Sequence, residues 1–183
     1  MEPIESLLDL LATKGSAQYG REAVSQLEHA LQSAQLAENE GAAPPLVAAA
    51  LLHDLGHLLY KHDKTGFGQD RDDRHEQVAG GILSKLFGPE VAEPVRLHVD
   101  AKRWLCARAE GYFETLSPAS VRSLELQGGA FAPEQADAFL MRPYAIEAIQ
   151  LRRWDDRAKV PGCVTRPIGA YADLLRGLAR AHS

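Results

Sequence analysis

The sequence predicts an all-α fold, and three observations support this. Apolar residues recur at helical spacing in most segments of the 183-residue chain. Proline opens several segments and glycine closes others, as is typical of helix ends. One segment, Pro45–Tyr60, is apolar nearly all round, which is typical of a buried central helix. We therefore expect a compact helical bundle around this segment, without strands or internal repeats.

Two amphipathic helices are predicted before the central one. The first has an apolar stripe and a glycine stop in the stretch PIESLLDLLATKG. The second is expected from about Arg21 to Asn39, with Gly41 just after its end. In the central helix, Gly56 lies among polar residues of the stretch LLHDLGHLLY, so we expect a break or bend there.

A polar loop and further helices follow the central helix. The stretch Lys61–Asp73 is polar and contains glycine, which predicts a loop with the character of a lid. A helix is expected over Arg74–Leu86, and the GPE triplet separates it from a helix that carries His98 and Lys102. Four shorter helices each begin at a proline: Pro118–Leu126, Pro133–Met141, Pro143–Trp154 and Pro167–Ala181.

Composition excludes several classes of partner. The formal net charge of −5 repels nucleic acid, and no cluster of lysine or arginine stands out. No apolar run approaches the ~20 residues that span a bilayer. The two cysteines, Cys106 and Cys163, fit free thiols in a reducing compartment, and the acidic N-terminus lacks the features of a signal peptide. We therefore expect a cytoplasmic protein that binds neither nucleic acid nor membranes.

Ionisable residues interrupt the central helix. The stretch AALLHDLGH, residues 49–57, carries His53, Asp54 and His57 in an otherwise apolar segment. Buried ionisable groups are rare unless they are paired or bind a metal. Other helices and helix ends supply further candidates, namely His29, His75, His98 and Asp155. Side chains from different helices of a bundle can converge on one buried point, so we predict a metal centre.

The residue types indicate two metal ions. Neutral imidazoles suit iron, zinc and manganese, and carboxylates compensate the charge of the metal. A first ion would take four ligands: His29, His53, Asp54 and Asp155. A second would take His75 and His98 and share Asp54, as in sites whose ions lie roughly 3.5–4 Å apart. A single histidine is more often a surface or core residue than a ligand, and we assign no role to His62 and His182.

The same residues resemble a known family. His29, the adjacent His53 and Asp54, and Asp155 resemble the metal signature of the HD-domain superfamily, which is all-α and mostly comprises metal-dependent phosphohydrolases. His75 and His98 resemble the two further histidines of its di-metal branch. The stretches HEQVAGGIL, HVDAKRWL, LSPASVRSLELQGGAF and IQLRRWDDRAKVP make residues 19–161 similar to the mixed-valent di-iron oxygenases of the PhnZ/TmpB type. This resemblance implies a single HD domain over residues 1–183, a helical bundle with a buried dinuclear metal centre.

The resemblance also implies roles for individual residues. The ions would be an Fe(II)/Fe(III) pair, with O2 as the co-substrate. Tyr19 would ligate the resting iron and leave when substrate arrives, and Glu22 would accompany this switch from the same helical face. The phosphonate would be held by five residues: His57, Lys102, Ser120, Ser123 and Arg152. Lys102 lies four residues after the ligand His98, and Arg152 three before Asp155, so each cation is expected to face the metals.

The implied reaction is oxidative cleavage of a C–P bond. The substrate would be 1-hydroxy-2-aminoethylphosphonate or its N-trimethyl form, which would yield phosphate and glycine or glycine betaine. Glu22 is the carboxylate best placed to meet the cationic end of such a substrate. Two alternatives use the same residues: a phosphohydrolase of a nucleotide or small phosphoester, and a non-catalytic HD sensor module. The form of the amine and the oligomeric state are left open at this point.

Overall fold

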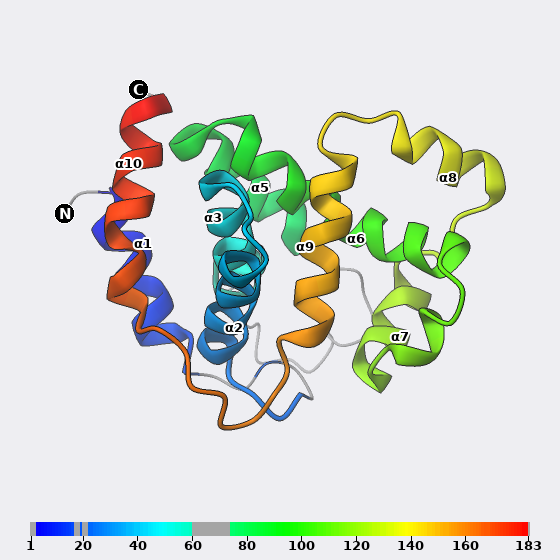
Figure 1. Ribbon diagram of the computed structural model, residues 1–183, viewed down its shortest axis with the longest axis horizontal. Coiled ribbons are helices and arrows are strands. Elements are labelled where there is room, and N and C mark those ends of the chain that lie inside the picture. Colours follow the sequence, from blue (N-terminus) through cyan, green and yellow to red (C-terminus); the bar gives the residue numbers. More distant parts are fainter. Residues whose placement is uncertain (1–2, 17–18, 20–21, 60–73, 183) are drawn as a thin grey trace.

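The computed structural model describes residues 3–16, 19, 22–59 and 74–182. These residues form an all-α bundle, which confirms the predicted fold class (Figure 1). Two short 3-10 helices, η2 (Phe113–Thr115) and η3 (Ile168–Tyr171), lie in the connections. The α-helices in chain order are α1 (Pro3–Lys14), α2 (Gln26–Asn39), α3 (Pro44–Leu52), α4 (Leu55–Leu59), α5 (His75–Phe87), α6 (Pro89–Arg108), α7 (Pro118–Leu126), α8 (Pro133–Leu140), α9 (Ala145–Arg157) and α10 (Ala172–His182).

Helix α3 lies inside the larger of two apolar cores. Its residues from Leu46 to Leu52 are all buried, because α2, α6 and α9 pack around it. On the left of Figure 1, α1 and α10 lie side by side and add leucines to the same core. A fully buried leucine side chain contributes about 1.5–3 kcal/mol to folding. This packing fixes the end of α3, and therefore the position of the polar residues that follow it.

Helix α6 joins this core to a second one. Val95 belongs to the first core, whereas Leu97 and Leu105 belong to the second. The second core also contains Phe139 from α8 and Ala148 from α9, on the right of Figure 1. Because α6 contacts α5, α3, α9 and α8 along its length, it connects both halves of the bundle. We propose that the described helices form one domain, as the sequence predicts.

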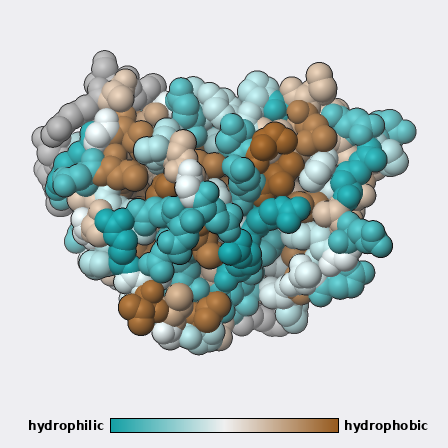
Figure 2. All heavy atoms as spheres, viewed as in Figure 1, coloured by the Kyte–Doolittle hydropathy of each residue, from teal (hydrophilic) through white to brown (hydrophobic). Residues whose placement is uncertain are grey.

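Hydrophobic side chains on the surface form separate patches. Figure 2 shows brown atoms divided by hydrophilic ones on the face that it presents. Met141, Ile146 and Val164 are among the exposed large apolar residues. Scattered apolar side chains of this kind are normal on a protein surface. Among the described residues, no helix combines the length and the apolar character needed to cross a membrane.

The second predicted helix begins later than expected, at Gln26. Ser25 caps it: the Ser25 hydroxyl accepts from the Glu28 N–H at 3.1 Å, and the Glu28 carboxylate accepts from the Ser25 N–H at 2.7 Å. This capping box fixes the helix start. Tyr19 and Glu22 therefore precede α2, in a turn where the Glu22 N–H donates to the Tyr19 carbonyl at 2.8 Å. The prediction that these two residues share a helical face was wrong.

The central helix breaks earlier than predicted. His53 and Asp54 separate α3 from α4, so Gly56 lies inside α4 rather than at the break. A Cβ atom on Gly56 would lie 2.1 Å from the carbonyl oxygen of His75. Glycine thus lets the start of α5 approach α4 closely, which brings His75 to the centre of the bundle.

Several other boundaries differ from prediction by a few residues. Arg74 and Tyr144 have positive φ angles of 48° and 64°, and this left-handed backbone delays the start of α5 and of α9. The predicted helix Pro167–Ala181 is divided into η3 and α10. The helix Pro118–Leu126 is confirmed. The predicted loop Lys61–Asp73 lies outside the described residues.

Candidate metal centre

Six ionisable side chains from distant parts of the chain meet at one buried point. They come from α2, the α3–α4 junction, the first residue of α5, α6 and α9, and each is at most 7% exposed. We call His29, His53, Asp54 and Asp155 the first metal group. The second metal group consists of Asp54, His75 and His98. The structure thus brings together all the residues that the sequence predicts as ligands.

The first metal group is compact. The Nε2 atoms of His29 and His53 lie 3.1 Å apart. Oδ1 of Asp155 is 3.3 Å from the His29 Nε2 and 3.9 Å from the His53 Nε2. Oδ2 of Asp54 lies 3.7 Å and 3.5 Å from the same two nitrogen atoms. Two nitrogen and two oxygen atoms therefore surround a single position.

The second metal group uses the other oxygen of Asp54. Oδ1 of Asp54 lies 3.3 Å from the His75 Nε2 and 3.9 Å from the His98 Nε2. The two Nε2 atoms are 3.4 Å apart. Because each oxygen of Asp54 faces a different pair of imidazoles, this carboxylate is shaped to bridge two ions.

Backbone carbonyls set the orientation of three of the imidazoles. The Nδ1 atoms of His29, His53 and His98 lie 2.9, 2.9 and 2.7 Å from the carbonyl oxygens of Ala158, Ala50 and Val95 respectively. A ring that donates from Nδ1 presents an unprotonated Nε2, which is the arrangement typical of metal-bound histidine.

This arrangement fits a metal and is costly without one. Unprotonated Nε2 atoms that face one another bring lone pairs into contact. Oδ2 of Asp54 and Oδ1 of Asp155 are buried and accept no hydrogen bond from any described residue. Buried polar atoms are rarely left in this state. Cations between these atoms would satisfy both features, so the residues fit two metal ions with nitrogen and oxygen ligands.

The charge states of Asp155 and His98 also suit metal ligation. Burial disfavours the ionised form of Asp155, but the adjacent Arg152 guanidinium holds the pKa of this carboxyl well below its usual range. Burial lowers the pKa of His98 well below its ordinary value, and the charge of His75 adds to this effect. Ionised carboxylates and neutral imidazoles are the forms that bind metals.

Tyr19 lies directly over the first metal group. Its ring stacks on the His29 ring, with centroids 4.1 Å apart and planes inclined by 11°. Burial raises the pKa of the Tyr19 hydroxyl well above its ordinary value, and the charge of Asp54, to which this hydroxyl is hydrogen-bonded, raises it further. Tyr19 therefore covers these ligands with a protonated hydroxyl, although it precedes α2 instead of belonging to it.

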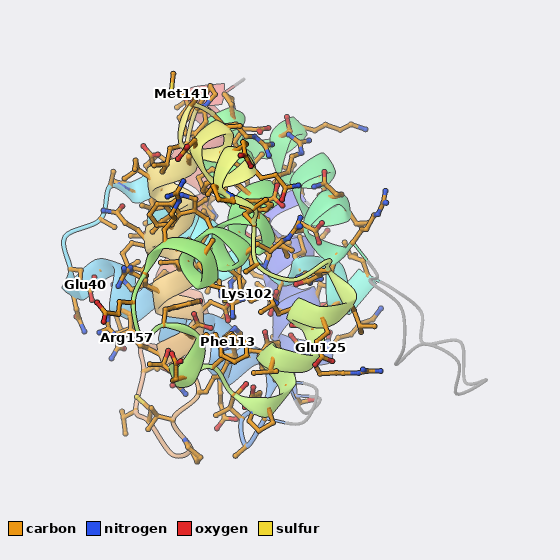
Figure 3. The ribbon with its side chains drawn as sticks, turned by 90° about the vertical axis from the view of Figure 1, so that its right-hand side faces the viewer. Glu40, Lys102, Phe113, Glu125, Met141 and Arg157 are labelled. Carbon is orange, nitrogen blue, oxygen red and sulfur yellow. The ribbon has the colours of Figure 1, made fainter. Side chains whose placement is uncertain are left out.

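Three of the predicted substrate ligands lie together: Ser120 and Ser123 belong to α7, and Lys102 packs against it. Ser117, Ser120 and Ser123 follow one another at intervals of three residues, and we call them the serine face. The Lys102 ammonium donates to the Ser123 hydroxyl at 2.6 Å. Lys102 is 2% exposed, and Figure 3 shows it in the interior while Glu125 and Met141 lie at the periphery.

Arg152 links the serine face to the metal groups. Its guanidinium donates to Asp155 Oδ2 at 2.6 Å and lies 3.5 Å from the Ser120 hydroxyl. It also pairs with Asp156, whose carboxylate accepts from the Tyr112 hydroxyl. One buried cation thus contacts both a predicted metal ligand and a predicted substrate ligand.

His57 lies beside Oδ1 of Asp54, next to the second metal group. Its ring stacks on His75 with centroids 3.8 Å apart, and its Nε2 is 3.9 Å from Oδ1 of Asp54. With 29% of its side chain exposed, it is more accessible than the six predicted ligands. Its position at the edge of the cluster fits contact with a substrate better than ligation of a metal.

Like Ser117, Lys159 is a site residue that sequence reasoning missed. Its ammonium lies 3.1 Å from the Glu22 carboxylate, 3.0 Å from the Ser120 hydroxyl and 3.5 Å from the Ser117 hydroxyl. The Ser117 hydroxyl also donates to Glu22 at 2.5 Å. Glu22, predicted to meet a cationic substrate group, is therefore already paired with a cation of the protein. The available signal was the position of Lys159 four residues after Asp155, just beyond the end of α9.

Comparison with known proteins places the chain among its relatives. Residues 27–158 match the family described as HD domain. The chain is 46% identical to the hydroxymethylphosphonate dioxygenase of Gimesia maris, over 93% of this chain and 85% of that protein. It is 32% identical to the 1-hydroxy-2-(trimethylamino)ethylphosphonate dioxygenase (glycine-betaine-forming) of Leisingera caerulea, over 98% of this chain and 91% of that protein. It is 30% identical to the uncharacterized protein L432 of Acanthamoeba polyphaga mimivirus, over 96% and 81% respectively.

The matched range begins in α2 and ends just after α9, and it contains all six residues of the two metal groups. Two of the relatives are named as dioxygenases, which use O2. These matches and the all-α bundle confirm the resemblance seen in the sequence. The chain therefore belongs to the HD-domain family, in its oxygenase branch.

Proposed function

We propose that the protein is a di-iron dioxygenase that cleaves the C–P bond of hydroxymethylphosphonate with O2. Both named relatives carry in their names a phosphonate with a hydroxyl group. Balance of atoms and charge gives formate, phosphate and a proton as the products of hydroxymethylphosphonate and O2. The substrates predicted from the sequence, 1-hydroxy-2-aminoethylphosphonate and its N-trimethyl form, differ by a cationic group on a second carbon. One ion pair of the site favours the smaller substrate.

The ion pair that favours the smaller substrate joins Glu22 to Lys159. Both side chains are largely buried, with 15% and 13% of their surfaces exposed. A substrate with its own ammonium group would have to compete with Lys159 for the same carboxylate. Like charges brought together at an interface cost several kcal/mol. The pair therefore supports a substrate that ends in a hydrogen atom instead of a charged amine.

The serine face and its cations support recognition of the phosphonate. The Lys102 ammonium contacts the Ser123 hydroxyl, and the Arg152 guanidinium and the Lys159 ammonium both contact the Ser120 hydroxyl. Arginine offers a planar fork of donors to an oxyanion, and lysine offers a point charge. These cationic donors would offer hydrogen bonds to the oxygen atoms of a phosphonate.

Iron fits the nitrogen and oxygen donors of the two metal groups, and two irons bound there would activate O2 for the oxidation. The protein would hold one ion with His29, His53, Asp54 and Asp155, and the other with Asp54, His75 and His98. Arg152 keeps Asp155 ionised and so maintains its capacity to ligate. Tyr19 covers the first group with its ring, and we propose that the substrate displaces this side chain.

The proposal predicts a specific pattern of turnover. Protein loaded anaerobically with Fe(II) and then given O2 should release phosphate and formate from hydroxymethylphosphonate in equal amounts. The value of kcat/KM should be at least about tenfold lower for 1-hydroxy-2-aminoethylphosphonate and its N-trimethyl form, which equals about 1.4 kcal/mol. A preference for either cationic substrate would refute the proposed substrate. Release of phosphate from phosphoesters under argon would instead support the phosphohydrolase alternative.

A second prediction concerns the pH dependence of substrate capture. Burial lowers the pKa of the Lys102 ammonium to about 7, and the charge of Arg152 adds to this effect. We expect kcat/KM to fall as the pH rises above about 7, because a neutral amine attracts the dianion less. A Lys102→Arg variant should lack this decline, since its guanidinium stays charged. Ionisation of the substrate affects both enzymes equally, so superimposable profiles would contradict the role of Lys102.

A further inference from the structure

The segment that follows α9 is attached to α2 on both sides of Lys159. On one side, the Ala158 carbonyl oxygen lies 2.9 Å from Nδ1 of His29. On the other, the side-chain amide of Gln32 donates to the Val160 carbonyl at 2.9 Å and accepts from the Val160 N–H at 3.0 Å. The backbone on the two sides of Lys159 is therefore bound to the same helix, α2, through His29 and through Gln32.

The buried side-chain amide of Gln32 is suited to holding the backbone that follows Lys159. It is 4% exposed, one turn beyond His29 on α2. A buried amide is costly to leave without partners, and here its donor and its acceptor both bind the backbone of one residue. This reciprocal pair fixes the orientation of the amide and the position of residue 160. A hydrophobic residue of similar size could fill the space but could not hold the segment.

The position of the Lys159 ammonium depends on this attachment. Its three contacts, with Glu22, Ser117 and Ser120, involve residues that lie 39 or more positions away in the chain. Lysine has a flexible four-carbon side chain, so only the placement of its backbone restricts where the ammonium can reach. A shift of this segment away from α2 would move the ammonium away from Glu22, so that the cationic group of a ligand would no longer compete with Lys159 for that carboxylate.

We propose that Gln32 is a positioning residue that selects the substrate through Lys159. By holding Val160 against α2, it keeps the Lys159 ammonium on Glu22 and thereby excludes ligands with a cationic tail. This inference rests on the proposed function, because it assigns the cause of the proposed preference. The other anchor, His29, belongs to the first metal group, so the same segment is held by a predicted metal ligand and by a residue without any such role.

Gln35 provides a matched control on the same helix. Its amide also joins α2 to this segment, accepting from the Arg166 N–H at 3.1 Å and donating to the Val164 carbonyl at 3.4 Å. It lies three residues after Gln32 and binds the segment beyond Lys159. Gln35→Leu therefore removes the same type of contact without releasing Val160.

The test compares the binding of two phosphonates of equal size, which needs no turnover. Propylphosphonate and 2-aminoethylphosphonate differ in a terminal methyl or ammonium group. By anaerobic calorimetry with the metal-loaded protein, the wild type should bind propylphosphonate about tenfold or more tightly than 2-aminoethylphosphonate. Gln32→Leu and Lys159→Met should each reduce this ratio about tenfold, and Gln35→Leu should leave it unchanged. In a Lys159→Met background, Gln32→Leu should have no further effect on the ratio.

Three results would overturn the inference. They are a wild-type protein that binds both ligands equally, a Gln32→Leu variant that keeps the wild-type ratio, and a Gln32→Leu effect that persists without Lys159. If Gln32→Leu does not fold, Gln32→Glu retains the acceptor for the Val160 N–H and removes the donor to its carbonyl. The same reduction is expected from it, and an unchanged ratio would count equally against the inference. Failure of O2-dependent turnover would refute the proposed function and leave these binding ratios to be judged separately.

Discussion

Replacing Asp54 by alanine is expected to lower the bound metal from about two ions per chain to fewer than one and to abolish O2-dependent phosphate release. Its two carboxylate oxygens face different pairs of imidazoles, so one substitution removes a ligand from both metal groups. Of the other carboxylates near the imidazoles, Asp155 is already paired with Arg152, and Glu76 lies 3.7 Å from Nδ1 of His75. Without Asp54, the first metal group would keep one carboxylate, Asp155, and the second metal group would keep none.

Two further variants separate this shared role from a general loss of structure. His98→Ala removes a ligand from the second metal group alone, so about one ion per chain should remain. Asp54→Asn keeps the shape but exchanges one oxygen for an amide nitrogen that donates and does not ligate, so it should also keep at most about one. Elemental analysis after anaerobic loading gives the stoichiometry, and circular dichroism checks the helices. Two ions per chain in folded Asp54→Ala protein would disprove the bridging role.

The meeting of the predicted metal ligands in one buried cluster could be foreseen from the sequence, because the cost of burying ionisable residues is visible there. Leu46–Leu52 is apolar on all sides, so His53 and Asp54 directly after it had to be buried with it. Burial of such residues requires a partner or a metal. Helical periodicity then placed the other ligands on separate helices, and the bundle left a common centre as the place where they could meet. The same logic gave the correct fold class.

Lys159 escaped prediction because its partners are remote in the chain. It lies 137 positions from Glu22 and 39 from Ser120, and a lysine after a helix end is normally exposed. Nothing in local periodicity indicates that this segment is held against α2 by an amide of Gln32. The start of α2 is different, because Ser25 and Glu28 form the S-x-x-E signature of a capping box. That signal was present in the sequence and would have separated Glu22 from the helix.

Replacing Arg152 by alanine is expected to have the largest effect on stability. Arg152 is 5% exposed, and its guanidinium lies between the carboxylates of Asp155 and Asp156, which would then face each other without that cation. Removal of one partner from a buried ion pair costs about 3–5 kcal/mol. In a chain of 150–250 residues, each kcal/mol shifts Tm by about 2–4 °C, so we expect a decrease of about 6–20 °C.

Arg157→Ala is the control variant, because it removes an ion pair that is exposed and so separates the effect of burial from the effect of losing an ion pair. Arg157 also lies on α9 and pairs with Glu40 at 2.6 Å, but its side chain is 54% exposed, and exposed pairs contribute about 0–1 kcal/mol. Thermal unfolding of metal-free protein is the appropriate measurement, because a bound metal would partly replace Arg152 as the cation beside Asp155. Metal-loaded Arg152→Ala should therefore recover part of the lost stability, whereas Arg157→Ala should differ little from wild type in either state. Equal Tm values for the two metal-free variants would mean that the Arg152 pairs do not act as a buried network.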